Sequence, residues 1–284
     1  SIFFTSCIEP FDLKTIDHEN NLVVEAIITN ELKKHQIKLS RTTQLELTEP
    51  TAESNATIII TDNSNNTYSF SEKNPGIYVS DINFKAELNK SYKIKITTSD
   101  NKIYSSTEEK IAGLGEINDV SGIIEDQTEG LNGISIYVKS NISDENANYF
   151  KYSFEETYKI ETPLWTNENI IINSDKNPFS VSRIFSNDKS KVCYISENSN
   201  KIIQTETSSL SENKINFKVQ YINKSDFKIS NRYSILITQQ VQSKNAYFYY
   251  KTLNKISSSE SAFVQNQPGL ITGNISSKGM CNSL

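Results

Sequence analysis

The chain has 284 residues, enough for about two domains of ordinary size, each with its own core. Its formal net charge of −5, with no dense run of lysine or arginine, excludes the positive field that would hold nucleic acid. No stretch of about 18 apolar residues occurs, so we expect membrane attachment to be covalent or through a partner. Isoleucine, 14 tyrosines and 13 phenylalanines dominate the apolar content, and these residue types favour sheet.

The first residues resemble the end of a signal peptide. An apolar run, Ile2 to Phe4, is followed by two small residues, Thr5 and Ser6, and then by Cys7. In one interpretation Cys7 is the lipidated residue of a bacterial lipoprotein, whose several acyl chains would anchor it stably. In the other, Cys7 is an ordinary thiol near a terminus. We interpret residues 1–19 as signal-peptide remnant, lipidation site and tether.

Two further cysteines, Cys193 and Cys281, form an even pair if Cys7 is lipidated. An oxidising compartment would permit a disulfide between them. Two cysteines do not make a disulfide framework, so a pair of unlinked thiols is the alternative.

Short β-branched and aromatic runs, separated by turn residues, predict about seven strands in the first domain. This spacing is typical of an immunoglobulin-like or transthyretin-like β-sandwich, which we place at residues 20–110. The loop 62–66 offers oxygen ligands for calcium but lacks the glycine and distal glutamate of a calcium loop, so we interpret it as a hairpin turn. The predicted strands are 22–29, 36–40, 56–61, 67–70, 77–79, 92–97 and 102–106.

Residues 111–133 contain five of the nine glycines, and we interpret this segment as a crossover between domains. The second domain, also β-rich, is predicted at residues 134–284. One helix is expected after Ser243, a good N-cap, because apolar residues recur there at spacings of three and four. We expect it to pack on a sheet rather than to form an aromatic ligand platform. The predicted strands are 134–138, 148–160, 192–196, 201–205, 215–221 and 233–239.

Glu156 is the most informative residue of the second domain, because it shares one strand face with an aromatic stripe that includes Phe154 and Tyr158. A carboxylate on such a face is either satisfied by tyrosines, backbone groups or an arginine, or has a raised pKa in a ligand pocket. The chain has three arginines, Arg41, Arg183 and Arg232. We take Glu156 and Arg232 as the candidate binding residues.

Motifs of common catalytic chemistry are absent from the sequence. The two histidines, His18 and His35, lie in no metal or nucleophile motif, and there is no P-loop, nucleophile elbow or paired-cysteine zinc spacing. A hydrolase with two distant carboxylates stays open, although the neighbours Glu155 and Glu156 do not form such a pair because they point to opposite faces of a strand. We therefore expect no enzyme, no cofactor and no metal.

Several blocks in order resemble the Bacteroidota outer-membrane lipoprotein family known as domain of unknown function 4249, over nearly the whole chain. The resemblance implies that Cys7 is lipidated, that the protein faces the cell surface, and that it works with a TonB-dependent outer-membrane transporter. It supplies no catalytic residue, and it implies that the chain is truncated at both ends. The blocks are residues 7–11, 22–29, 39–41, 149–158, 233–239, 246–253, 267–269 and 273–275.

The sequence thus leaves three functional hypotheses. The first is a lipid-anchored accessory of a transporter or envelope assembly. The second is a surface protein that captures carbohydrate or peptide directly. The third is a hydrolase with dispersed carboxylates.

Overall fold

The computed structural model describes residues 20–42, 50–126, 132–142, 144, 146–185, 191–207, 214–257 and 273–277. Cys7, the predicted tether and Cys281 lie outside the described residues. The described chain is mostly antiparallel strand with one α-helix, which confirms the predicted all-β, sandwich-like fold class. It divides into two compact units, described separately below.

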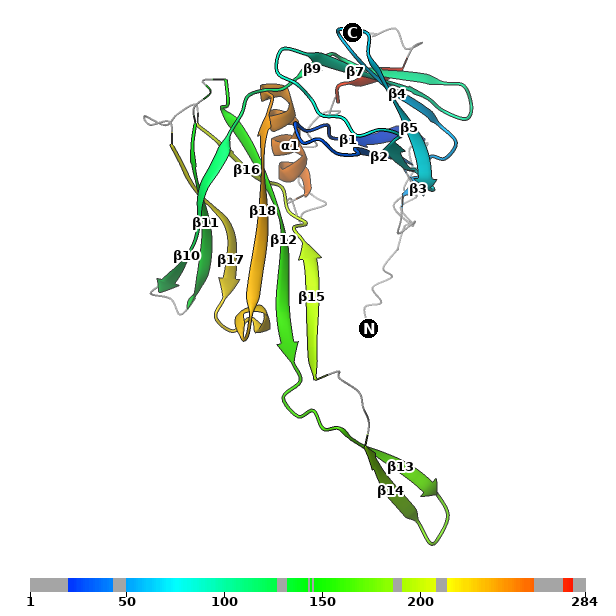
Figure 1. Cartoon of the computed structure of the whole chain (residues 1–284), viewed down its shortest axis with the longest axis vertical. Coiled ribbons are helices and arrows are strands. Elements are labelled where there is room, and N and C mark those ends of the chain that lie inside the picture. Colours follow the sequence, from blue (N-terminus) through cyan, green and yellow to red (C-terminus); the bar gives the residue numbers. More distant parts are fainter. Residues whose placement is uncertain are drawn as a thin grey trace, which may run out of the picture. The chain divides into compact units, whose positions relative to one another are not determined.

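The first unit consists of the described residues up to Ile111 together with 273–277, and forms a ten-stranded antiparallel sheet. The order along the sheet is β1-β2-β6-β5-β4-β7-β8-β19, with β3 also paired to β2 and β9 to β7 (Figure 1). The strands are β1 (Leu22–Ala26), β2 (Gln36–Arg41), β3 (Thr51–Ala52), β4 (Thr57–Asp62), β5 (Thr67–Asn74), β6 (Ile77–Ser80), β7 (Ser91–Thr97), β8 (Ile103–Ser106), β9 (Glu109–Lys110) and β19 (Ile275–Ser277).

The core of the first unit follows from the two-residue alternation of its strands. Ile37 and Leu39 of β2 are fully buried, while Lys38 between them is exposed. Ile58 in β4 and Ile96 in β7 are cross-strand partners on the same buried face. Because the sheet curls, these inward side chains meet in one hydrophobic cluster.

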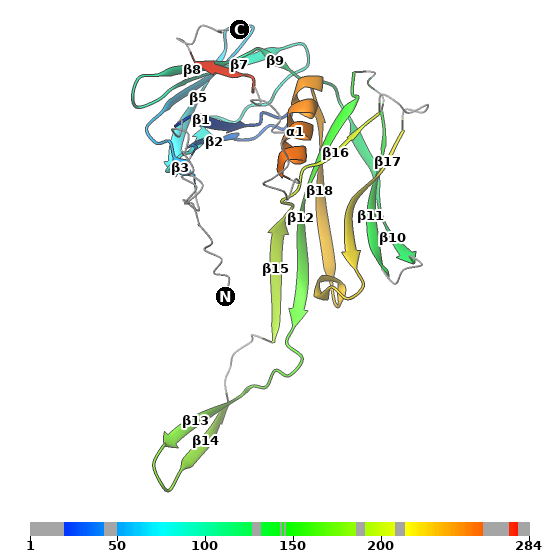
Figure 2. The same cartoon turned by 180° about the vertical axis from the view of Figure 1, so that it is seen from behind.

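The second unit is built from the described residues between 112 and 272 and contains two sheets that face each other (Figures 1 and 2). One sheet has the order β10-β11-β17; in the other, β12 pairs with β18, β15 and β16. A separate hairpin joins β13 to β14. The elements are β10 (Glu116–Asp126), β11 (Asn132–Asn141), β12 (Tyr149–Glu161), β13 (Glu168–Ser174), β14 (Ser180–Phe185), β15 (Val192–Asn198), β16 (Ile203–Glu206), β17 (Lys214–Asn223), the 3-10 turn η1 (Phe227–Ile229), β18 (Tyr233–Gln242) and α1 (Lys244–Ser257).

The predicted aromatic stripe of β12 forms one side of the core of the second unit. Phe150 and Tyr152 are fully buried and pack in one cluster with Val138 of β11 and Val219 of β17. The hydroxyl of Tyr152 donates to Oε1 of Gln239 at 3.0 Å, so its buried polar atom is satisfied. Burial raises the pKa of Tyr152.

Helix α1 begins as expected after Ser243, whose Oγ accepts the backbone N–H of Ala246 at 3.2 Å. Tyr247 is its buried residue, and the Tyr247 ring lies 4.8 Å from that of Tyr149 at the start of β12. The helix therefore packs on the sheet, while Phe248 and Tyr249 stay exposed.

The domain limits differ from those expected from the sequence. Strand β10 lies in the middle of the glycine-rich segment 111–133, which we interpreted as a crossover, and the division between the units falls after Ile111. Its β-branched residues pair with β11, and the glycines and acids beside them obscure this pattern in the sequence. Residues 275–277, assigned to the second domain, pair with β8 of the first unit. A three-residue strand carries too little pattern to indicate which sheet it joins.

Candidate functional site

Glu156 lies in the middle of β12, with its side chain on the inner, aromatic face. The residue is 3% exposed, whereas its neighbour Glu155 is exposed, as strand alternation predicts. The carboxylate is therefore a buried acid that needs partners.

The structure supplies these partners from three other elements. Nζ of Lys228 in η1 lies 2.5 Å from Oε1 of Glu156, and the hydroxyl of Tyr233 in β18 donates to Oε2 at 2.8 Å. Nε2 of Gln220, from the facing sheet, donates to Oε2 at 3.4 Å. Both carboxylate oxygens thus accept hydrogen bonds, and one of them faces an ammonium group as an ion pair.

A second carboxylate stands directly beside the first. Strand register makes Glu197 of β15 the cross-strand partner of Glu156, a like-charge pair that is unfavourable by itself. Nζ of Lys228 lies 2.7 Å from Oε2 of Glu197 and so contacts both acids. The hydroxyl of Tyr158 donates to Oε1 of Glu197 at 3.0 Å. We call Glu156, Glu197, Lys228, Tyr158, Tyr233 and Gln220 the Glu156 cluster.

The electrostatics of the cluster follow from these contacts. Burial by itself lowers the pKa of Lys228, but its hydrogen bonds and charge interactions with Glu156 and Glu197 outweigh burial, and the pKa is raised. The hydrogen bond from Lys228 holds the pKa of Glu197 below its ordinary value. Burial and the nearby Glu156 raise the pKa of Tyr233.

This arrangement is that of a bridge between elements. One lysine from the η1 turn holds two acids of neighbouring strands, and Gln220 reaches across from the facing sheet. Each acid is committed to donors of the protein, so the cluster fixes η1 against β12 and β15.

The other candidate, Arg232, lies just before β18 and is exposed. The backbone carbonyl of Arg232 accepts the N–H of Lys159, and this contact does not involve the Glu156 cluster. The expectation that a tyrosine satisfies Glu156 holds, but the cation is Lys228 rather than an arginine. Arg41 pairs with Glu53 at 2.6 Å and Arg183 with Glu168 at 3.4 Å.

Lys228, Glu197 and Gln220 were not singled out by the sequence. The alternation of the strand 192–196 would have placed residue 197 on the face shared with Ile195, but neither its partner strand nor its register follows from that pattern. Lys228 lies in a turn without periodicity, so only the folded chain brings it to Glu156.

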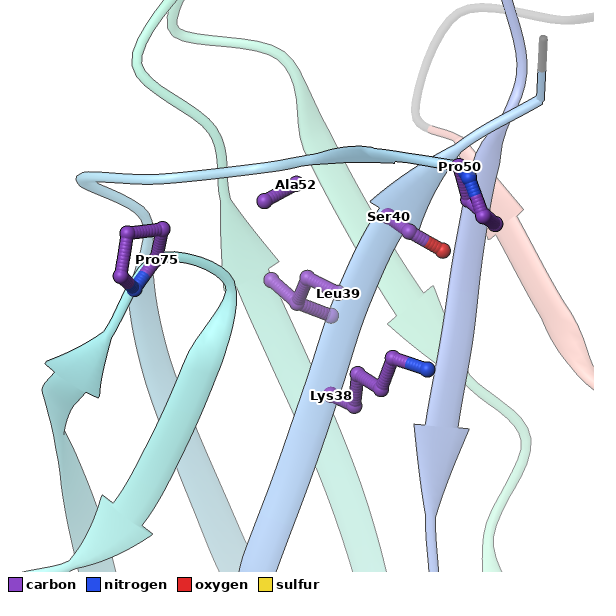
Figure 3. Close-up of a pocket in the computed structure, with 6 residues that line it drawn as sticks. All are labelled: Lys38, Leu39, Ser40, Pro50, Ala52 and Pro75. Carbon is purple, nitrogen blue, oxygen red and sulfur yellow. The ribbon is translucent and has the colours of Figure 1, made fainter. Parts of the chain in front are cut away.

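A shallow hollow of about 300 Å³ lies in the first unit between β2, β3 and the β5–β6 turn (Figure 3). Among the described residues that line it, Lys38 is the charged one, and the Nζ atom of Lys38 lies 3.4 Å from Oε1 of Glu25. The hollow is lined by Lys38, Leu39, Ser40, Pro50, Ala52 and Pro75.

The loop 62–66 is a hairpin turn organised by Asp62. Its Oδ1 accepts the backbone N–H groups of Ser64 and Asn66, both at 2.9 Å, and its Oδ2 accepts the side-chain amide of Asn66 at 2.8 Å. These contacts, with the Asn66 side chain the strongest, lower the pKa of Asp62 to about 2. The carboxylate of Asp62 therefore stabilises the hairpin turn, as expected from the sequence.

Asp62→Asn should change the acid stability of the first unit. Because the folded pKa is depressed from 3.8 to about 2, the contribution of Asp62 is present above pH 3.8 and is lost as the pH falls towards 2. Hydrogen exchange of β4 and β5 peptides, followed between these pH values, should show a steeper loss of protection in the wild type than in the variant. Equal slopes for the two proteins would contradict this assignment.

Neither histidine motif nor metal cluster emerges from the described residues. His35 is 2% exposed, its Nε2 lies 2.9 Å from the carbonyl oxygen of Phe84, and burial lowers its pKa. Within the described ranges, no group of three histidine, cysteine or acidic side chains is placed to hold a metal ion. Cys193 in β15 is exposed, and its pairing with Cys281 stays a prediction. In the same part of the chain, no helix has the length and apolar character needed to cross a membrane.

Fold and site together define an all-β protein of two units, in the second of which a buried glutamate forms an ion pair with a lysine. The family model described as "Domain of unknown function (DUF4249)" matches residues 8–280, and the chain belongs to this family. No curated protein matches the sequence.

Proposed function

We propose that the protein is a lipid-anchored protein of the bacterial outer membrane that faces the cell surface and binds a partner rather than catalysing a reaction. The observation that carries the non-catalytic role is the Glu156 cluster, whose two acids are both held by Lys228. A general acid or nucleophile needs a carboxyl group that is free to reach a substrate. Here the carboxylate oxygens of Glu156 already accept hydrogen bonds from Lys228, Tyr233 and Gln220.

Anchoring is supported by the residues around Cys7, where two small residues precede the thiol and a segment with two acidic residues, 8–12, follows it. The resemblance of its sequence blocks to an outer-membrane lipoprotein family supports the same proposal. The partner we propose is a TonB-dependent transporter or another envelope assembly, which an anchored β-sandwich would meet at the same membrane.

Cys7→Ser should move the protein from the membrane to the soluble fraction, because the acyl chains that hold it would have no thiol to modify. The measurement is detergent-phase partitioning of cell fractions, together with the mass of the peptide that contains Cys7. Cys193→Ser is the matched control and should leave partitioning unchanged. An unacylated Cys7 in native membranes would contradict the anchor.

The same native preparation tests the partner. Affinity purification of the wild-type protein in mild detergent should co-purify an outer-membrane barrel protein, and Cys7→Ser should reduce its yield.

Exposed aromatic residues on α1, Phe248 and Tyr249, favour a second candidate, direct capture of carbohydrate or peptide. Saturable binding of a glycan by the purified chain without a barrel partner would favour capture instead, and a turnover abolished by Glu156→Gln would revive the hydrolase.

A further inference from the structure

Among the described residues, the β13–β14 hairpin is the one pair of strands that joins none of the three larger sheets. Its strands pair only with each other, in antiparallel register (Figures 1 and 2). A two-stranded hairpin is marginally stable in water unless a hydrophobic face packs against something else.

The register separates the side chains into two unlike faces. Ile172 pairs with Val181, and Ile170 pairs with Arg183, on one face that also includes Glu168 and Phe185. The four apolar side chains of this face are far more exposed than the isoleucines of the opposite face, Ile171 (42% exposed) and Ile184 (44%). We call this the open face; its apolar members are Ile170 (70% exposed), Ile172 (68%), Val181 (66%) and Phe185 (75%).

The size of the open face indicates an interface. Four such side chains expose on the order of 500 Å² of apolar surface, comparable to the largest patch on an ordinary monomer and often functional. Two copies packed face to face would remove on the order of 1,000 Å² from water, the size at which a specific interface becomes plausible. They would also give four strands in two layers, which is enough to form a small core.

The charges of the open face match a second copy of itself. Arg183 lies opposite Ile170 in the register and 3.4 Å from Glu168, so the face carries one guanidinium and one carboxylate. When a two-fold axis relates the two copies, Arg183 of one copy pairs with Glu168 of the other, and the symmetry forms the same pair a second time. A bilayer interior offers no partner to this ion pair or to the outer backbone edges of the two strands.

We propose that the open face of the β13–β14 hairpin is a homodimer interface, in which two hairpins stack around a two-fold axis. The interface uses none of the three larger sheets, so dimerisation leaves both units folded and their other surfaces available.

Sedimentation velocity over a concentration series tests the dimer with the full chain carrying Cys7→Ser, so that lipid cannot bring copies together. The chain should dimerise, and Ile172→Asp should weaken dimerisation at least tenfold because it places a charge among the apolar side chains of the interface. Asn169→Asp adds the same charge to the opposite face and should leave the dimer intact. Far-UV circular dichroism checks that both variants remain folded.

A charge exchange tests the symmetry independently of folding. Glu168→Arg gives a face with two cations and Arg183→Glu gives a face with two anions, so each variant alone should dimerise weakly. An equimolar mixture should form heterodimers in preference to either homodimer. A monomeric chain at all concentrations, a dimer insensitive to Ile172→Asp, or a mixture without preference would overturn the proposal, as would monomers that instead bind neutral phosphatidylcholine vesicles through this face.

Discussion

Lys228→Ala should lower the free energy of unfolding of the second unit by about 3 kcal/mol, because it leaves a buried carboxylate without its cation. The side chain of Glu156 is 5% exposed and faces Glu197 on the neighbouring strand. In the variant, the two carboxylates would lie side by side with no cation between them. The loss lies at the lower end of the range usual for buried ion pairs, because the Lys228 side chain is 20% exposed. Urea unfolding followed by circular dichroism, with hydrogen exchange of β12 peptides, measures the loss.

Two controls separate the buried pair from its surface partner. Glu197→Gln should cost much less than Lys228→Ala, because the Glu197 side chain is 47% exposed and solvent screens its pairing with Lys228. The double variant Glu156→Gln with Lys228→Met should be more stable than Lys228→Ala, since no unpaired charge remains buried. If the two changes instead added their separate costs, the ion pair would not be the reason for the effect.

The advantage of the wild type over Lys228→Ala should also depend on pH. Because the folded pKa of Lys228 is raised, its contribution is complete below 10.5 and is lost as the pH rises through the folded value. Because the folded pKa of Glu197 is lowered, its contribution is complete above 4.5 and is lost as the pH falls. The difference between the two proteins should therefore be largest between these limits.

Gly133→Ala should destabilise the second unit by about 3 kcal/mol, since the new methyl group would overlap backbone that cannot move aside easily. A Cβ at this position would lie 2.4 Å from the carbonyl oxygen of Ile222 and 2.7 Å from the ring of Tyr221. The clash falls at the end of the β11–β17 pairing, where Gly133 faces Asn223.

Gly122→Ala is the matched control for this substitution. Its Cβ would meet nothing nearer than Cγ2 of Ile134 at 3.4 Å, in the exposed strand β10. Alanine should be neutral or stabilise by about 0.5 kcal/mol, because it reduces the freedom of the unfolded chain. Thermal unfolding of both variants measures the contrast, and equal losses would show that the close approach at Gly133 is relaxed in solution.

If the open face dimerises as proposed, each assembly would carry two copies of both units. Two lipid anchors would then act together, and a partner bound by both copies would be held more strongly than by one. The Glu156 cluster would remain a matter of stability within each copy.

The local sequence pattern by itself determines which side chains of this protein are buried in its strands and where its helix and one turn begin. Alternation in residues 36–40 and 148–160 predicted which side chains enter the cores, because the two-residue period of a strand depends only on chain geometry. The helix start at Ser243 and the turn at Asp62 were equally local, since their hydrogen bonds span two to four residues.

Tertiary structure alone decided everything that joins distant segments. The sequence indicated that Glu156 needs partners, but Lys228 lies 72 positions away in an aperiodic turn, and only strand pairing brings the two together. The same holds for β19, which returns to β8, and for Gly133, whose role appears only against β17. A side-chain pattern specifies which face of a strand is buried; which strand lies opposite depends on the packing of the whole unit.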